Sequence, residues 1–162
     1  MTADLVTQPD FAILLTAASR CVADRLVQAV AEVGKGVMRP SYGFVLRAVA
    51  AEQPTVSRLA ELLGVSKQAA SKLADDMVTA GFLERGGDPA DRRRTPLQLT
   101  AVGQRVRSTA LAESQAMEME LRARFGDAAA DQLRLLLTDF VQRHGGGPEI
   151  AAQRSRAPLD TG

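Results

Sequence analysis

Several residue types on which whole classes of protein depend are scarce in this chain of 162 residues. It contains one cysteine, Cys21, so no intrachain disulfide can form. Its one histidine, His144, has no companion histidine or cysteine near it in the sequence, and a zinc site needs several such ligands. His144 lies at the end of the last predicted helix, a position from which we assemble no Ser–His–Asp set. We therefore expect no metal site, no cofactor and no catalytic residues.

Aromatic residues and long apolar runs are also scarce. Aromatic residues make up 4% of the chain and tryptophan is absent, whereas 46% of the residues are hydrophobic. A core built mainly from Leu, Val and Ala favours helices over a β-sandwich. No run of about 18 apolar residues occurs, so we expect no membrane span. The first ten residues hold two acids, Asp4 and Asp10, and no basic segment, which argues against a signal peptide and for a cytoplasmic protein.

Overall charge is close to balanced, with a formal net charge of +1. There is therefore no bulk polycationic attraction to nucleic acid. Residues 55–107 nevertheless hold nine Lys or Arg against six Asp or Glu. The position of these cations matters more than their sum.

The most informative stretch, residues 55–85, predicts two short helices joined by a tight turn. Gly64 is placed to end the first helix, because glycine adopts a positive φ without steric cost. Ser66 is placed to cap the second helix, since its hydroxyl can accept from a free backbone N–H. One face of this second helix is apolar and the other is polar, which suits a helix that reads base edges and phosphates in a major groove. The candidate DNA-binding residues on the polar face are Ser66, Lys67, Gln68, Ser71 and Lys72.

The next segment, residues 82–99, predicts a β-hairpin with a charged tip, or wing. Leu97 and Leu99 alternate with polar or proline positions, as in a returning strand. Pro96 removes one ladder donor, which an edge strand tolerates. Consecutive arginines at a hairpin tip are well placed to enter a minor groove. The candidate residues at the tip are Asp91, Arg92, Arg93 and Arg94.

In this combination and order, the sequence resembles the MarR family of winged helix-turn-helix transcriptional regulators. The resemblance rests on five segments, which are Thr55–Ala60, Leu63–Ser66, Ala80–Leu83, Asp88–Arg93 and Leu97–Gly103. It implies that Asp91 and Arg93 form the Asp-x-Arg element of the wing and that Arg93 enters the minor groove. It also implies a homodimeric repressor on double-stranded DNA with a pseudo-palindromic operator. A small effector, phenolic or otherwise aromatic, would release such a repressor.

The expected fold is therefore mainly α with a small β-hairpin wing. Residues 9–36 and 100–144 predict long helices that form a helical dimerisation region, and residues 39–99 form the winged helix-turn-helix domain. Residues 145–162 are polar with almost no core-forming residues, so we expect a disordered tail.

Effector pockets of the MarR family often lie between the first long helix, the next helix and the fifth helix. By resemblance, the candidate pocket residues are Ala18, Cys21, Val22, Tyr42 and Leu46. Ordinary packing explains Tyr42 and Leu46 at least as well.

Two alternatives remain open from the sequence. Cys21 lies beside Arg20 and four residues from Arg25, and a nearby cation lowers the pKa of a thiol and raises its reactivity. Because a peroxide-sensing branch of the family uses a cysteine on its first helix, one alternative is a peroxide-sensing repressor. The other alternative is a winged helix that binds protein rather than DNA, which only the low net charge supports.

Overall fold

The structure, a computed structural model, describes residues 9–34, 38–87 and 95–146. Its elements are α1 (Phe11–Gly34), α2 (Pro40–Glu52), α3 (Val56–Leu63), α4 (Lys67–Thr79), β1 (Leu83–Arg85), β2 (Leu97–Leu99), α5 (Ala101–Phe125), α6 (Asp127–Val141) and a π-helical turn, η1 (Gln142–Gly146). A mainly helical fold with one small antiparallel sheet is therefore confirmed. None of the helices in the described ranges is long and apolar enough to cross a membrane.

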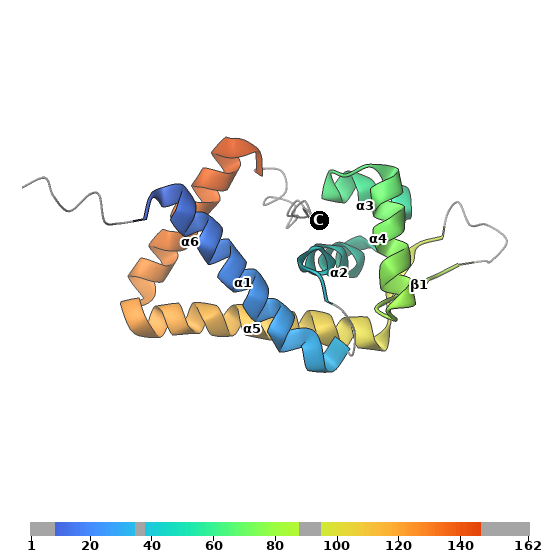
Figure 1. The fold of residues 1–162 in the computed structure, drawn as a ribbon, viewed down its shortest axis with the longest axis horizontal. Coiled ribbons are helices and arrows are strands. Elements are labelled where there is room, and N and C mark those ends of the chain that lie inside the picture. Colours follow the sequence, from blue (N-terminus) through green and yellow to red (C-terminus); the bar gives the residue numbers. More distant parts are fainter. Residues whose placement is uncertain (1–8, 35–37, 88–94, 147–162) are drawn as a thin grey trace, which may run out of the picture.

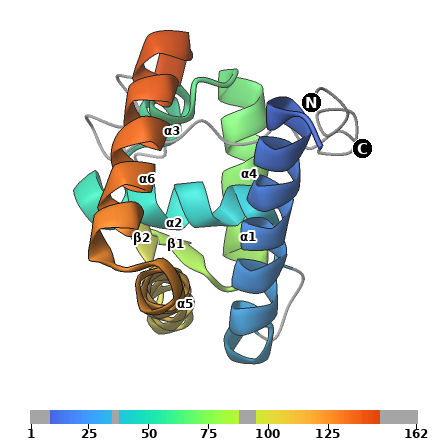
Figure 2. The same ribbon diagram turned by 90° about the vertical axis from the view of Figure 1, so that its left-hand side faces the viewer.

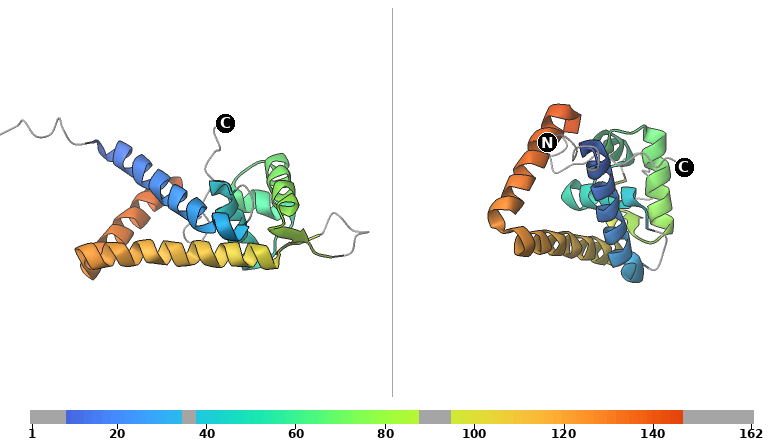
Figure 3. Two further views of the ribbon diagram at one scale, coloured as in Figure 1. Left: turned by 60° about the horizontal axis from the view of Figure 1, so that its bottom comes forward. Right: turned by 60° about the vertical axis from the view of Figure 1, so that its left-hand side comes forward.

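Helix α5 runs along one side of the molecule and connects its two parts (Figure 1). At the N-terminal end of α5 lie α2, α3, α4 and the sheet, which together make the winged helix. Helix α1 begins away from α5 and crosses it toward its own C-terminal end, and α6 turns back from the far end of α5 (Figures 2 and 3). The division into a winged-helix domain and a dimerisation region stays a prediction.

Short-range hydrogen bonds set the starts of α3 and α4, and of these two caps the sequence predicted the one at Ser66. The side-chain oxygen of Thr55 accepts from the Arg58 N–H, and the oxygen of Ser66 accepts from the Ala69 N–H. Each bond satisfies one of the N–H groups that a helix leaves free in its first turn. Gly64 ends α3 with a φ of 66°, in the left-handed region that favours glycine.

The base of the predicted wing is a two-stranded antiparallel sheet in which Leu83 pairs with Leu99 and Arg85 with Leu97. Each strand has three residues. Pro96 lacks an N–H, but its carbonyl accepts from the Gly86 N–H at 2.8 Å. Proline is therefore compatible with the hairpin because it continues the pairing as an acceptor.

The buried core lies mainly in the winged helix, where α2, α3, α4 and the sheet pack against the start of α5. Phe82 is fully buried, and its ring meets that of Tyr42 edge-on with centroids 6.0 Å apart. The Phe82 carbonyl accepts from the backbone N–H of Thr100, while the Thr100 hydroxyl donates to the Gly81 carbonyl at 2.6 Å and lies 3.2 Å from the Phe82 carbonyl oxygen. These contacts attach the N-terminus of α5 to β1, so the long helix and the winged helix meet through a buried joint.

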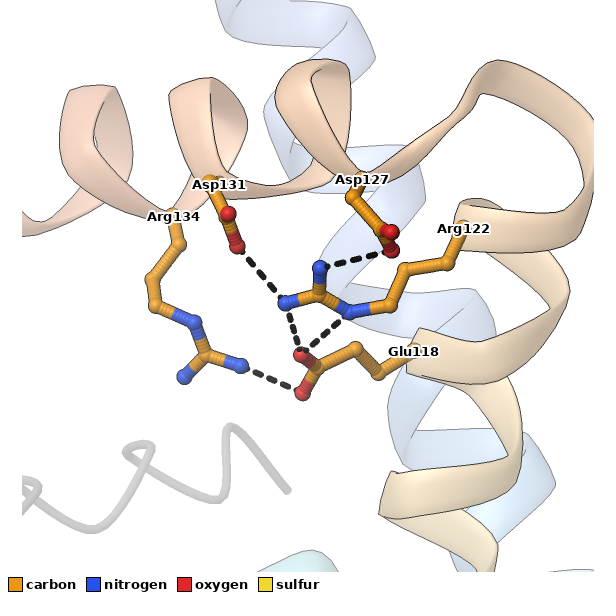
Figure 4. A network of polar contacts seen from close by, with 5 residues as sticks. All are labelled: Glu118, Arg122, Asp127, Asp131 and Arg134. Carbon is orange, nitrogen blue, oxygen red and sulfur yellow. Dashed lines mark hydrogen bonds and ion pairs between the residues drawn. The ribbon is translucent and has the colours of Figure 1, made fainter.

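The corner between α5 and α6 is formed by Gly126, which occupies the cap position of α6 with a φ of 86°, and no side chain caps this helix. Asp127 is the first helical residue and accepts from Arg122 instead. Figure 4 shows the cluster at this corner, in which carboxylates and guanidinium groups of α5 and α6 alternate. Its members are Glu118, Arg122, Asp127, Asp131 and Arg134.

Candidate nucleic-acid interface and effector cavity

Helix α4 has one buried face and one face open to solvent. Ala70, Ala74 and Met77 are fully buried and hold the helix against the core of the winged helix. The predicted DNA-binding residues lie away from this core: Ser66, Lys67, Gln68 and Lys72 are exposed and Ser71 is half-buried. The structure therefore brings these five predicted residues together on one accessible surface.

The two lysines of this surface form no ion pair with any described residue, in contrast to many arginines of the chain. Arg25, Arg58, Arg122, Arg134 and Arg143 each pair with a carboxylate. Among the residues that the structure describes, those outside such pairs are Arg124, in the last turn of α5, and five that lie on α2, α4 or the first turns of α5, namely Lys67, Lys72, Arg47, Arg105 and Arg107. Unpaired cations of this kind are available for phosphate groups.

Two adjacent carboxylates of α4 point to different neighbours. Oδ1 of Asp75 lies 2.6 Å from an Nη2 atom of Arg85 at the end of β1. Oδ2 of Asp76 lies 3.8 Å from Nη1 of Arg39, which immediately precedes α2. Helix α4 is thus tied on one side to the sheet and on the other to the start of α2.

The predicted tip residues of the wing, Asp91, Arg92, Arg93 and Arg94, lie outside the described residues, as does the predicted tail from residue 147 onward. Their predicted roles stay predictions. The described base of the hairpin ends at Gly87 and resumes at Thr95, beside the C-terminal half of α4.

A cavity of about 260 Å³ lies between α1, α2 and the first half of α5. Most of its walls are apolar, and of the predicted pocket residues Val22 and Leu46 line it. Ala18, Cys21 and Tyr42 do not line this cavity: Ala18 and Cys21 are exposed on α1, and Tyr42 is buried against Phe82. Three arginines that sequence reasoning did not single out also line it, namely Arg39, Arg47 and Arg107.

These arginines could not be recognised as a group from the sequence. Arg39 immediately precedes α2, Arg47 lies on α2 and Arg107 lies on α5, and these two helices meet only in the folded chain. No Asp or Glu lines the cavity, although carboxylates are frequent elsewhere on the same helices. The polar part of the lining is completed by the hydroxyls of Ser19 and Ser114. An apolar interior with cations at its edge can accommodate a molecule that has an apolar body and a negatively charged group.

The surroundings of Cys21 differ in part from those on which the peroxide-sensing alternative rests. Cys21 is a free, exposed thiol on α1. Arg20 lies 3.9 Å from Asp24, and Arg25 donates hydrogen bonds to Glu113 and Glu120 of α5. Both nearby cations are therefore already paired with carboxylates. The structure adds no support for a reactive thiolate at Cys21.

Metal chemistry also finds no geometric support in the described part of the chain. No group of three or more His, Cys, Asp and Glu side chains there is arranged to hold a metal ion.

Comparisons with known proteins agree with this geometry. The model of the MarR family matches residues 38–94, which span α2 to the wing. A search among proteins with curated functions gives no match.

Solved structures resemble more than four-fifths of the chain. The YusO protein from Bacillus subtilis is 22% identical, with a TM-score of 0.62 over 88% of this chain and 99% of that one. MepR from Staphylococcus aureus, in complex with DNA, is 18% identical, with a TM-score of 0.62 over 82% and 96%. The MarR family protein RV2887 from Mycobacterium tuberculosis, in complex with salicylic acid, is 20% identical, with a TM-score of 0.56 over 84% and 99%. At these identities the likeness concerns the fold.

Proposed function

We propose that this chain, a MarR family winged-helix protein, is a cytoplasmic, non-enzymatic transcriptional regulator that binds a pseudo-palindromic DNA site as a homodimer. The observation that carries the proposal is the exposed polar face of α4, with Lys67 and Lys72 free of ion pairs among the described residues. The match of residues 38–94 to the MarR family and the fold shared with a DNA-bound regulator support it.

Helix α4 has the features of a recognition helix. An α-helix fits the major groove, and residues near its N-terminus reach the base edges. Gln68 offers an amide that can bond an adenine in two places, and Lys67 offers an ammonium group for guanine or phosphate. The wing, through Arg93 in the minor groove and Arg92 and Arg94 on phosphates, completes the proposed contact.

The homodimer is supported by the apolar side chains that α1, α5 and α6 leave exposed. A folded chain seldom exposes so many large apolar side chains on neighbouring helices unless another surface covers them. The most exposed of them are Phe11, Ile13, Met119, Phe125, Leu135 and Leu136. A second copy is the occupant that a two-fold DNA site requires, because each protomer then reads one half-site.

The cavity between α1, α2 and α5 supports regulation by a small molecule. A cavity of about 150 Å³ is enough to hold benzene, so this one can hold a phenolic or other aromatic ring. It lies where the winged helix meets the long helices, so a ligand there contacts both parts of the molecule. In this proposal the protein represses transcription until the effector binds.

The proposal is tested by selecting duplexes from a random pool with the full-length protein and measuring their affinity by fluorescence anisotropy at several salt concentrations. Lys67→Ala should weaken binding to the selected site by about 1–3 kcal/mol if it reads a base, with relaxed preference at one position per half-site. If Lys67 contacts only phosphate, the loss should be uniform and the salt slope should fall by about one.

Arg20→Ala is the matched control, because Arg20 is a highly exposed cation on α1, outside the winged helix. It should leave the DNA affinity unchanged. Failure of the pool to yield any preferred duplex would contradict the proposal and favour a winged helix that binds protein. Equal losses in the two variants would show that α4 is not the reading element.

A further inference from the structure

We propose that Lys67 and Lys72 are acylation sites, at which transfer of an acyl group from an acyl phosphate to the ε-amine neutralises the polar face of α4 and releases DNA. This inference rests on the proposed function, because it assigns a covalent modification to the surface that would read DNA. The modification needs no ligand in the cavity between α1, α2 and α5.

Lysine is rare in this chain and unevenly placed. Among its 20 Lys and Arg, only Lys35, Lys67 and Lys72 are lysines, and Lys35 lies outside the described residues. Within the described ranges both lysines therefore lie on α4, and every other Lys or Arg position is an arginine. A guanidinium group stays protonated in proteins, whereas a lysine amine can lose its proton and act as a nucleophile. The acylable cations of the described chain are thus those of the proposed recognition helix.

Both ammonium groups are accessible and uncompensated. Lys67 and Lys72 are exposed and form no ion pair with the described residues. Asp75 and Asp76 lie within one turn of Lys72, but each pairs with an arginine outside α4. No Asp or Glu lies within four positions of Lys67 in the sequence. An acyl phosphate is an anion, so two uncompensated cations raise its concentration beside the amines.

The transfer is a substitution at the acyl carbon. The ammonium group first loses a proton to water, and the nitrogen lone pair then attacks the carbonyl carbon of the acyl phosphate. An N–C bond forms and the C–O bond to phosphate breaks. Inorganic phosphate leaves with the electron pair of that bond and takes up the second proton that nitrogen loses. The product is a neutral amide, which keeps an N–H but carries no charge.

Acylation should remove charge without disturbing the fold. Neither ammonium group is bonded to a described residue, and Lys67 is the first residue of α4, where the positive end of the helix dipole disfavours a cation. Each ammonium group that contacts a phosphate displaces counterions from DNA. Acylation of both lysines should therefore weaken DNA binding by about tenfold or more per lysine and lower the salt slope by about two.

The experiment treats the full-length protein with acetyl phosphate and locates the acetyl groups by mass spectrometry of its peptides. The affinity for a selected duplex is then measured by fluorescence anisotropy at several salt concentrations. Acetylation of Lys67 and Lys72 should increase in step with the loss of affinity, and duplex added before the reagent should protect both lysines. The melting temperature, followed by circular dichroism, should stay unchanged.

Two double variants separate the amine from its charge. Lys67→Arg with Lys72→Arg keeps both charges but has no amine on α4, so acetyl phosphate should not change its affinity for the duplex. This comparison is made against the same variant before treatment, so that a different starting affinity does not matter. Lys67→Gln with Lys72→Gln carries neutral amides, so its affinity and its salt slope should match those of the fully acetylated wild type.

The outcomes distinguish this proposal from the proposed function. Absence of acetyl groups from both lysines, or full affinity in a protein acetylated at both, would overturn acylation alone. An equal loss of affinity in the arginine variant would also overturn it, because another site would then carry the effect. A fall in melting temperature that accompanies acetylation would attribute the loss to unfolding and overturn it as well. If the untreated protein binds no duplex, the proposed function and the release of DNA fail together.

Discussion

Substitution of Gly103 by alanine provides a stringent test of the joint between α5 and the winged helix. Gly103 is buried in the first turn of α5, and a Cβ added there would lie 2.0 Å from the carbonyl oxygen of Phe82 and 3.0 Å from its carbonyl carbon. The oxygen cannot retreat freely, because it accepts from the Thr100 N–H at 3.1 Å. The Thr100 hydroxyl lies 3.2 Å from the same oxygen and makes its shorter bond, of 2.6 Å, to the Gly81 carbonyl. The Thr100 hydroxyl is itself the cap of α5, since it accepts from the Gly103 N–H.

The expected effect combines two opposing contributions. Alanine is about 1 kcal/mol more favourable than glycine within a helix. Relieving the clash requires α5 to move away from β1 by more than an ångström, and overpacking of this kind costs about 1–3 kcal/mol or more. Each Thr100 hydrogen bond that is lost adds about 1 kcal/mol. We therefore expect Gly103→Ala to lower the free energy of unfolding by about 2 kcal/mol, a fall of roughly 4–8 °C in Tm for a chain of this size.

Gly43→Ala is the matched control. Gly43 also lies within a helix, α2, but a Cβ there would have nothing within 4 Å. The propensity gain is then unopposed, so this variant should be about 0.5–1 kcal/mol more stable than the wild type. Both variants are measured by urea unfolding, followed by far-ultraviolet circular dichroism at one protein concentration. If Gly103→Ala proves as stable as Gly43→Ala, the close approach of α5 to Phe82 is wrong.

Two further predictions concern the long helices. Arg134 and Arg122 hold the pKa of the Glu118 carboxyl below its usual value, and Arg25 does the same for Glu120. Because the pKa is lowered in the folded state, this stabilisation is fully present above the unfolded pKa of about 4.3 and is lost as pH falls through the folded value. As the pH falls below about 5, the Tm of Glu118→Gln and of Glu120→Gln should therefore fall less than the Tm of the wild type. Parallel plots of Tm against pH for all three proteins would refute this. Leu136→Glu, on the exposed apolar side of α6, should shift the protein to a monomer in sedimentation experiments; a stable dimer in Leu136→Glu would exclude this face from the interface.

Much of the local structure was predictable because its causes lie within a few residues of each other. Thr55 and Ser66 each cap a helix by bonding an N–H three residues further on, and Gly64 adopts a positive φ without help from distant residues. The alternation around Leu97 and Leu99 likewise indicated a returning strand. The polar face of α4 followed from helical periodicity alone, so its accessible residues were identified from the sequence.

The sequence also determined the fold class, since helix starts, helix stops and the apolar pattern all agreed with a winged helix flanked by long helices. Tertiary structure alone decided which charges are free and which are paired. Arg39 and Asp76 are 37 positions apart, and Arg25 meets Glu113 only because α1 crosses α5. No periodic pattern encodes such a meeting, because it depends on the angle and distance at which helices pack. For the same reason the arginines around the cavity emerged only when α1, α2 and α5 were assembled: side chains from separate elements share a site only after packing brings those elements together.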